Sequence, residues 1–115
     1  MEDSYVHSSF EDGVPVARVK REKIGDFESK PLLGDLTTLA QSHGWKIAVD
    51  MTEIALLGSQ GIGVFLTLHK TCNQNKGKMA LCCISEEIYQ MLVLSALTRL
   101  FTIKKTVAEA VAAVK

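Results

Sequence analysis

The chain has 115 residues, and its 13 lysines and arginines balance 13 aspartates and glutamates. This length favours one domain spanning residues 1–115, because two domains of ordinary size would not fit. The zero net charge excludes the broad positive field that drives binding to phosphate backbones, so neither nucleic acid nor an anionic membrane is an expected partner.

No segment of the sequence is predicted to enter a membrane. Residues 1–4 are acidic and lead into no apolar stretch, and no apolar run approaches the ~20 residues of a membrane span. We therefore expect a soluble, cytoplasmic protein.

The three cysteines of the chain, of which Cys82 and Cys83 are adjacent, fit neither a disulfide framework nor a zinc-binding spacing. They are expected to be small buried side chains in a reducing compartment, with no metal and no cofactor.

The N-terminal segment predicts an antiparallel hairpin. Residues 5–10 and 14–21 are expected to be strands, and the turn between them contains Asp12-Gly13, a pair typical of hairpins. Pro15 lacks an amide hydrogen, so it should lie near the start of the second strand.

A helix is expected next. Residues 22–29 show no clear period and are predicted to form a loop. Pro31 then suits the first turn of a helix that runs to about Ser42 and stops before Gly44. The inner face of this helix is expected to hold Leu32, Leu33, Leu36, Leu39 and Ala40.

From Trp45 onward, strands and helices alternate. Residues 45–51 alternate in polarity and predict one strand, while the nearly continuous apolar run 78–84 predicts another that is buried on both faces. Between them, a helix is expected from about Ser59 to Asn75. Its inner face is predicted to hold Ile62, Phe65, Leu66, His69 and Cys72.

The C-terminal part predicts two further helices and a short strand. Ser85 should cap a helix, and the apolar run 91–94 is too wide for one helical face, so at least one of its side chains should be exposed. Residues 100–103 predict an edge strand and residues 106–114 a final helix. The whole pattern predicts an α/β fold: a mixed β-sheet with an N-terminal antiparallel hairpin and right-handed β-α crossovers.

The segment around Ser59 is where chemistry is most plausible, because a predicted loop becomes a helix there. Serine is a preferred N-cap, so capping alone explains the residue. A helix N-terminus also attracts anions, so a hydroxyl there can carry a phosphate as well, although capping is the simpler interpretation. Glycines at 58, 61 and 63 do not match the spacing of nucleotide-binding loops.

A family resemblance becomes visible at this point, in the run Gly58-Ser59-Gln60-Gly61-Ile62-Gly63. It resembles the Asp-Ser-Ser-Gly-Leu-Gly motif of STAS domains, the anti-sigma factor antagonist family. Residues 94–103 and the helix after them resemble that family's Ser-Gly-Leu-x-x-Leu-Phe segment and closing helix, with Ala96 where the family usually has glycine. The resemblance covers roughly residues 45–114 and implies a STAS-like fold.

The resemblance also implies a function. The first serine of the family motif is the phosphoacceptor, and it matches Ser59. The implied partner is an anti-sigma factor that is also a serine kinase, and phosphorylation of Ser59 would end the binding. Gly58, Gln60, Gly61 and Ile62 are then expected on the partner-binding surface. A serine phosphatase is a second partner that this scheme accommodates.

Two alternatives stay open. Gly58 replaces the acidic residue of the family motif and Gln60 its second serine, which allows a STAS scaffold or ligand-binding module without the switch. The other alternative is a small α/β enzyme that uses Cys72 or Asp50. Neither a catalytic triad nor a metal-like histidine spacing can be assembled from local sequence, and Asp50 is better suited to forming a turn, so an enzyme is not the expectation.

Overall fold

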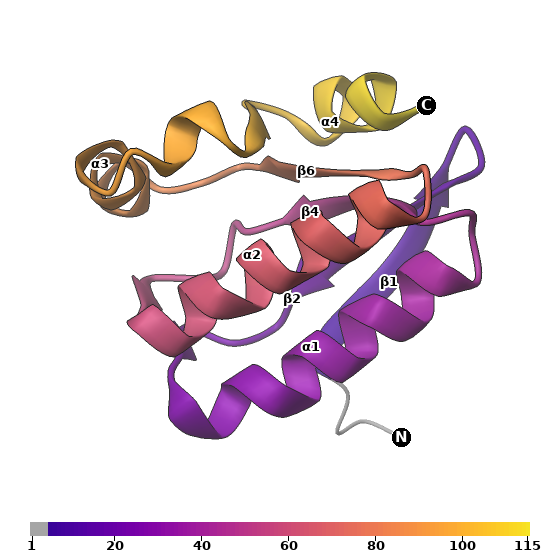
Figure 1. Cartoon of the computed structure of the whole chain (residues 1–115). Coiled ribbons are helices and arrows are strands. Elements are labelled where there is room, and N and C mark those ends of the chain that lie inside the picture. The colour runs from indigo at the N-terminus through magenta and orange to yellow at the C-terminus, as the bar shows by residue number, and fades with distance from the viewer. Residues whose placement is uncertain (1–4) are drawn as a thin grey trace.

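Five strands form the central sheet in the order β1-β2-β4-β6-β7, in a computed structural model that describes residues 5–115 (Figure 1). The strands are β1 (Val6–Glu11), β2 (Val14–Val19), β4 (Lys46–Asp50), β6 (Lys78–Cys82) and β7 (Thr102–Lys104). A separate ribbon pairs β3 (Lys23–Ile24) with β5 (Leu56–Leu57). The helices are α1 (Asp26–Gln41), α2 (Ser59–Gln74), α3 (Glu86–Leu94) and α4 (Val107–Val114), with a 3-10 turn, η1, at Leu97–Arg99.

The predicted mixed sheet is confirmed. Strands β1 and β2 are antiparallel, whereas β2, β4, β6 and β7 run parallel, with β7 at the edge. The hairpin turns at Asp12 and Gly13, whose φ angles of 55° and 80° are the left-handed values that a two-residue hairpin turn requires.

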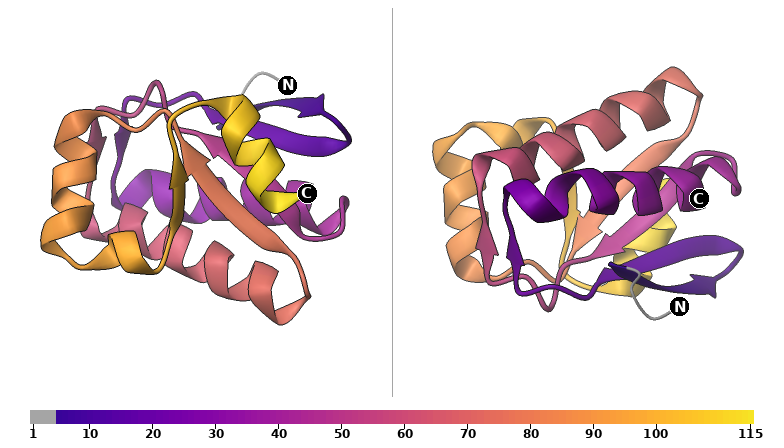
Figure 2. Two further views of the ribbon diagram at one scale, coloured as in Figure 1. Left: turned by 90° about the horizontal axis from the view of Figure 1, so that it is seen from above. Right: turned by 90° about the horizontal axis from the view of Figure 1, so that it is seen from below.

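Helices α1 and α2 cover one face of the sheet, and α4 covers the other (Figure 2). The larger core lies beneath α1 and α2 and also takes in Ile88 and Leu92 of α3. In the smaller core, three residues of α4 pack against the sheet: Ala110, Val111 and Val114 lie with Val14, Val16, Ala48 and Ala80. The sheet is therefore buried on both faces, as its apolar central strands predict.

Helix α1 begins five residues before the position that Pro31 suggested, and the predicted loop at residues 22–29 is wrong. Residues Lys23–Ile24 pair with β5, and the helix starts directly afterwards at Asp26. The start is fixed by Glu28, whose Oε1 accepts a hydrogen bond from the Gly25 amide at 2.8 Å. Pro31 therefore lies inside the helix, and this local capping outweighs its preference for the first turn.

The buried face of α2 is rotated relative to the predicted one. The buried residues are Gly61, Val64, Phe65, Leu68 and Cys72, whereas Ile62, Leu66 and His69 are only partly buried. Helix α1 lies alongside α2 (Figure 1) and covers a flank that the sequence pattern left to solvent.

The C-terminal elements follow their predictions closely. Ser85 caps α3, since its Oγ accepts a hydrogen bond from the Ile88 amide at 3.2 Å. Leu94 is 87% exposed, which confirms that the apolar run at residues 91–94 exceeds the face that α3 can bury. After α3 the backbone turns through Ala96 in a left-handed conformation (φ 61°, ψ 21°), which accounts physically for the glycine usual at this position in the family that the chain resembles.

Candidate functional site

Ser59 is exposed at the beginning of α2, but it is not the N-cap as predicted. Gly58 holds that position, with an extended backbone at φ −80° and ψ 177°. The pairing of β5 with β3 ends at Leu57, and the helix begins at Ser59, one residue earlier than a Ser59 cap would require. Within residues 5–115 the Ser59 hydroxyl has no hydrogen-bond partner. The oxygen is therefore available at the end of the helix where the backbone amides are partly positive.

Contacts with β3 fix the first turn of α2 in place. The Gly58 amide donates a hydrogen bond to the Ile24 carbonyl oxygen at 3.0 Å. A Cβ atom at Gly61 would lie 2.9 Å from that same oxygen and 2.6 Å from Cδ1 of Leu57, so only glycine lets the turn approach β3 this closely. Gly63 has open space around it, so its presence has no such packing reason.

The residues predicted to contact a partner differ in exposure. Gly58 and Gln60 are exposed beside Ser59, Ile62 is half-buried, and Gly61 is buried. Gly61 therefore lies beneath the surface, where it lets the first turn of α2 pack against β3. The first turn of α2 carries no acidic side chain, so nothing there offsets the positive end of the helix.

Two exposed apolar side chains flank this end of the molecule. Phe27, in the first turn of α1, is 90% exposed, and Leu56, in β5, is 62% exposed. The starts of α1 and α2 lie side by side (Figure 2), so both side chains belong to the end of the molecule that carries Ser59. Sequence reasoning missed Phe27 because its segment was taken for a loop. We call Phe27, Leu56, Gly58, Ser59 and Gln60 the Ser59 surface.

Comparison with known proteins identifies the family. Residues 18–110 match the family model of the STAS domain. The chain belongs to the STAS domain family. The match begins near the end of β2, well before Trp45, so β3 and α1 belong to the STAS domain even though the sequence motifs become visible only later.

Two relatives of this STAS domain are named as anti-sigma factor antagonists. Proteins named anti-sigma-B factor antagonist from Listeria monocytogenes and Listeria innocua are each 26% identical over 67 residues, or 58% of this chain. The match covers 59% of the length of each relative.

Solved structures share the fold. An anti-sigma-factor antagonist (STAS) domain protein from Planctomyces limnophilus superposes with a TM-score of 0.80 at 19% identity, over 94% of this chain and 96% of that one. Bacillus SpoIIAA in its phosphorylated form gives a TM-score of 0.68 at 16% identity, over 94% and 97% of the two chains.

The structure shows the surroundings of Asp50 and Cys72, the two residues of the enzyme alternative, in this STAS domain. Asp50 forms a turn, because its Oδ1 accepts hydrogen bonds from the Thr52 amide at 3.0 Å and from the Thr52 hydroxyl at 2.5 Å. Burial raises the pKa of the Cys72 thiol to about 11, so this cysteine is protonated at neutral pH and is no nucleophile. His69 is half-buried and meets the Phe101 ring edge-on, with ring centroids 5.9 Å apart.

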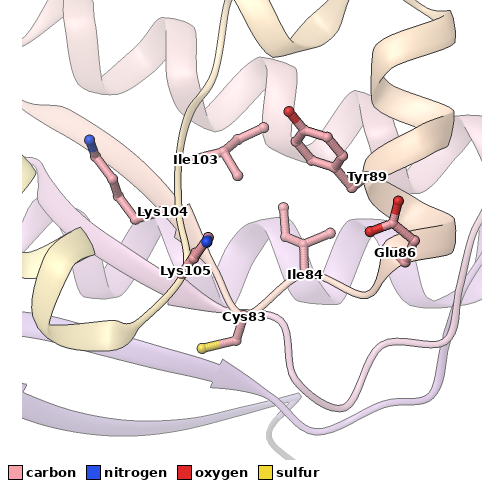
Figure 3. A pocket seen from close by; sticks show the side chains of 7 residues that line it. All are labelled: Cys83, Ile84, Glu86, Tyr89, Ile103, Lys104 and Lys105. Carbon is pink, nitrogen blue, oxygen red and sulfur yellow. The ribbon is translucent and has the colours of Figure 1, made fainter.

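A hollow of about 370 Å³ lies at the carboxyl ends of β6 and β7 (Figure 3). Ile84, Tyr89 and Ile103 form its apolar side, and Glu86 and Lys105 are among its polar residues. This hollow contains none of the residues of the Ser59 surface.

Among residues 5–115, no helix combines the length and the apolar character needed to span a bilayer.

Proposed function

We propose that this STAS domain is an anti-sigma factor antagonist, which binds an anti-sigma factor through the Ser59 surface. The observation that carries the proposal is the exposed Ser59 hydroxyl, free of hydrogen-bond partners within residues 5–115, at the first turn of α2. The Listeria relatives named anti-sigma-B factor antagonists support it. Because such a partner acts on the transcription machinery, the proposal locates the protein in the cytoplasm.

The Ser59 surface has the composition of a protein-binding patch. An aromatic ring at Phe27 and an aliphatic side chain at Leu56 are exposed beside polar backbone and the Gln60 amide. Aromatic anchors surrounded by a polar rim are typical of protein interfaces. We therefore assign Phe27 and Leu56 as apolar anchors of the interface, with Ser59 at the start of α2.

We further propose that the partner is a serine kinase that switches the interface off. It would transfer the terminal phosphoryl group of ATP to the Ser59 oxygen, releasing ADP and the hydroxyl proton. A serine phosphatase would reverse the state by hydrolysis. The phosphate adds about 1.5–2 negative charges.

The magnitudes indicate where the phosphate acts. Its attraction to the exposed start of α2 is worth only about 0.3–1 kcal/mol. An unpaired charge buried in an interface costs about 3–5 kcal/mol, which is roughly a hundredfold to several thousandfold in affinity. The effect on partner binding therefore exceeds any effect on the fold.

A second candidate is a STAS scaffold or ligand-binding module that is not phosphorylated. It is favoured by the absence of an acidic side chain in the first turn of α2, where Gly58 and Gln60 replace the family's aspartate and second serine. A kinase that recognises a carboxylate beside the acceptor would find none there.

Two measurements separate these functions. Incubation of the protein with ATP and a lysate of the source organism should add one phosphate to the wild type and none to Ser59→Ala, as measured by intact mass. Affinity capture then supplies the partner for titrations. Ser59→Asp should weaken that binding at least about tenfold while Ser59→Ala preserves it, because only the first places a charge in the interface. Ser9→Asp, which adds the same charge on exposed β1, is the control and should bind like the wild type. Equal affinities for Ser59→Asp and Ser59→Ala would contradict the switch.

A further inference from the structure

Three side chains of ligand type meet on the α4 side of the sheet, away from the Ser59 surface. Asp50 ends β4, Cys82 ends β6 beside it in register, and Cys83 follows directly. One carboxylate oxygen and the two sulfur atoms all lie within 4.8 Å of one another. These residues stand at the carboxyl ends of parallel strands, where open α/β sheets gather their binding groups.

The backbone at Cys83 is what brings the two thiols together. Successive side chains of a strand point to opposite faces, so a strand continued through Cys83 would place its thiol opposite that of Cys82. Cys83 instead has a φ of 61°, a left-handed value that is uncommon for a residue with a side chain. As a result, Cys83 packs against the same cluster beneath α4 that contains Cys82. Figure 3 shows the Cys83 sulfur pointing away from Ile84 and Tyr89.

Each of the three side chains keeps an atom that can bind a cation. Asp50 is held through Oδ1 by Thr52, which leaves Oδ2 without a hydrogen-bond partner among residues 5–115. The Cys82 sulfur donates a long hydrogen bond of 3.5 Å to the Val49 carbonyl oxygen and interacts with the Cys83 thiol beside it. Cys83 is half-exposed and lines the hollow of about 370 Å³, which gives an ion a route from solvent.

We propose that Asp50, Cys82 and Cys83 bind one zinc-class divalent cation. Thiolates select ions of this softness over magnesium or calcium, and one carboxylate with two thiolates suits Zn²⁺. Both thiols lose their protons to solvent on binding. Three protein ligands leave the fourth tetrahedral position for water.

The geometry and charge fit this ion. Zn–S bonds of about 2.3 Å and Zn–O bonds of about 2.0–2.2 Å place tetrahedral ligands roughly 3.5–4 Å apart, so the ligand atoms, now within 4.8 Å of one another, need to close by at most about 1.3 Å. Two thiolates and a carboxylate exceed the charge of the ion by one negative charge. Lys104 is the register partner of Cys82 on β7 and has no ion-pair partner within residues 5–115, so it can balance that charge.

The test is a zinc titration of the reduced, chelator-treated full chain against a chromophoric zinc chelator. We expect one Zn²⁺ per chain. Cys83→Ser and Asp50→Asn should each weaken binding about 100-fold or more, since even residues that only support the ligands cost 10–100-fold. Asp50→Asn keeps an oxygen for the Thr52 turn, and Cys83 is half-exposed, so both variants should fold.

Cys72→Ala is the matched control, because it removes a buried thiol outside the cluster and should leave zinc affinity unchanged. Zinc should also raise the melting temperature of the wild type and of Cys72→Ala, but not that of Cys83→Ser. The proposal is overturned if the reduced protein binds no stoichiometric zinc, or if Cys83→Ser and Asp50→Asn bind it as well as the wild type. It is also overturned if Cys72→Ala loses binding equally.

Discussion

Gly61→Ala and Gly63→Ala make a matched pair of substitutions in the first two turns of α2. Both replace glycine by alanine in the same helix, so both gain about 1 kcal/mol of helix propensity. They differ in what the new methyl group meets. At Gly63 there is nothing within 4 Å, whereas at Gly61 the methyl would lie 2.9 Å from the Ile24 carbonyl oxygen.

The expected difference follows from that one contact. The Leu57 methyl at 2.6 Å can move aside, but the Ile24 oxygen is backbone and already accepts the Gly58 amide. Relieving the overlap has to displace the start of α2 from β3, and overpacking of this kind costs about 1–3 kcal/mol. Gly63→Ala should therefore be more stable than the wild type by up to ~1 kcal/mol. Gly61→Ala should be less stable than Gly63→Ala by about 1–3 kcal/mol.

Urea unfolding followed by circular dichroism measures this difference directly. With a slope of about 1–3 kcal/mol per molar urea, the two midpoints should be separated by about 1 M. Coincident midpoints, or a higher midpoint for Gly61→Ala, would refute the close approach of α2 to β3. Because the same contact positions Ser59, Gly61→Ala should also weaken partner binding.

Two further predictions concern the core and the turn after α3. The Cys72 pKa is raised from 9.0 to about 11 in the folded protein, so the fold favours the protonated thiol. Its contribution is complete below about pH 9 and is lost as pH rises towards 11, by about 2–3 kcal/mol in all. Unfolding free energies measured from pH 8 to 11 should therefore fall more steeply for the wild type than for Cys72→Ala, and equal slopes would contradict the assignment. Ala96→Gly should raise the unfolding free energy by about 0.5–1 kcal/mol, because it removes a side chain from a left-handed position. Ala108→Gly, at an exposed position of α4, is its control and should lower stability by about 1 kcal/mol, and a loss of stability in Ala96→Gly would contradict the reasoning.

The strands of the central sheet can be predicted from the sequence because the residue patterns that specify them are local. The Asp12-Gly13 pair specifies a hairpin turn, and the apolar run at residues 78–84 predicts a buried strand, of which the structure contains Lys78–Cys82. Ser85 and Thr106 act as helix caps, as the residue types indicate. Each of these features depends on neighbours within a few residues, so tertiary packing does not override them.

The sequence-based predictions fail where contacts between distant segments of the chain determine the structure. The pairing of Lys23–Ile24 with β5 depends on residues more than 30 positions apart, and it both ends the supposed loop and moves the cap from Ser59 to Gly58. Phe27 lies in the same segment, so its position in the first turn of α1 and its exposure could not be predicted either. The buried flank of α2 depends on α1, which hydrophobic periodicity within one helix does not report.

The cysteine cluster shows a different limit. Adjacent cysteines in a strand are expected on opposite faces, and the spacing rules for metal ligands count positions along one segment. Asp50 comes from another strand, and the left-handed backbone at Cys83 cannot be read from a residue type that seldom adopts it. The candidate zinc ligands therefore become visible only in three dimensions.

The uneven covering of the sheet bears on how the chain folds during synthesis. Helix α4 is translated after every strand it covers, so Val14 and Val16 leave the ribosome long before Ala110 and Val111 exist to shield them. At about 5–20 residues per second this interval lasts roughly 5–20 s, during which that side of the sheet stays uncovered. The apolar surface that completes the native sheet is thus also the one whose shielding comes last in synthesis.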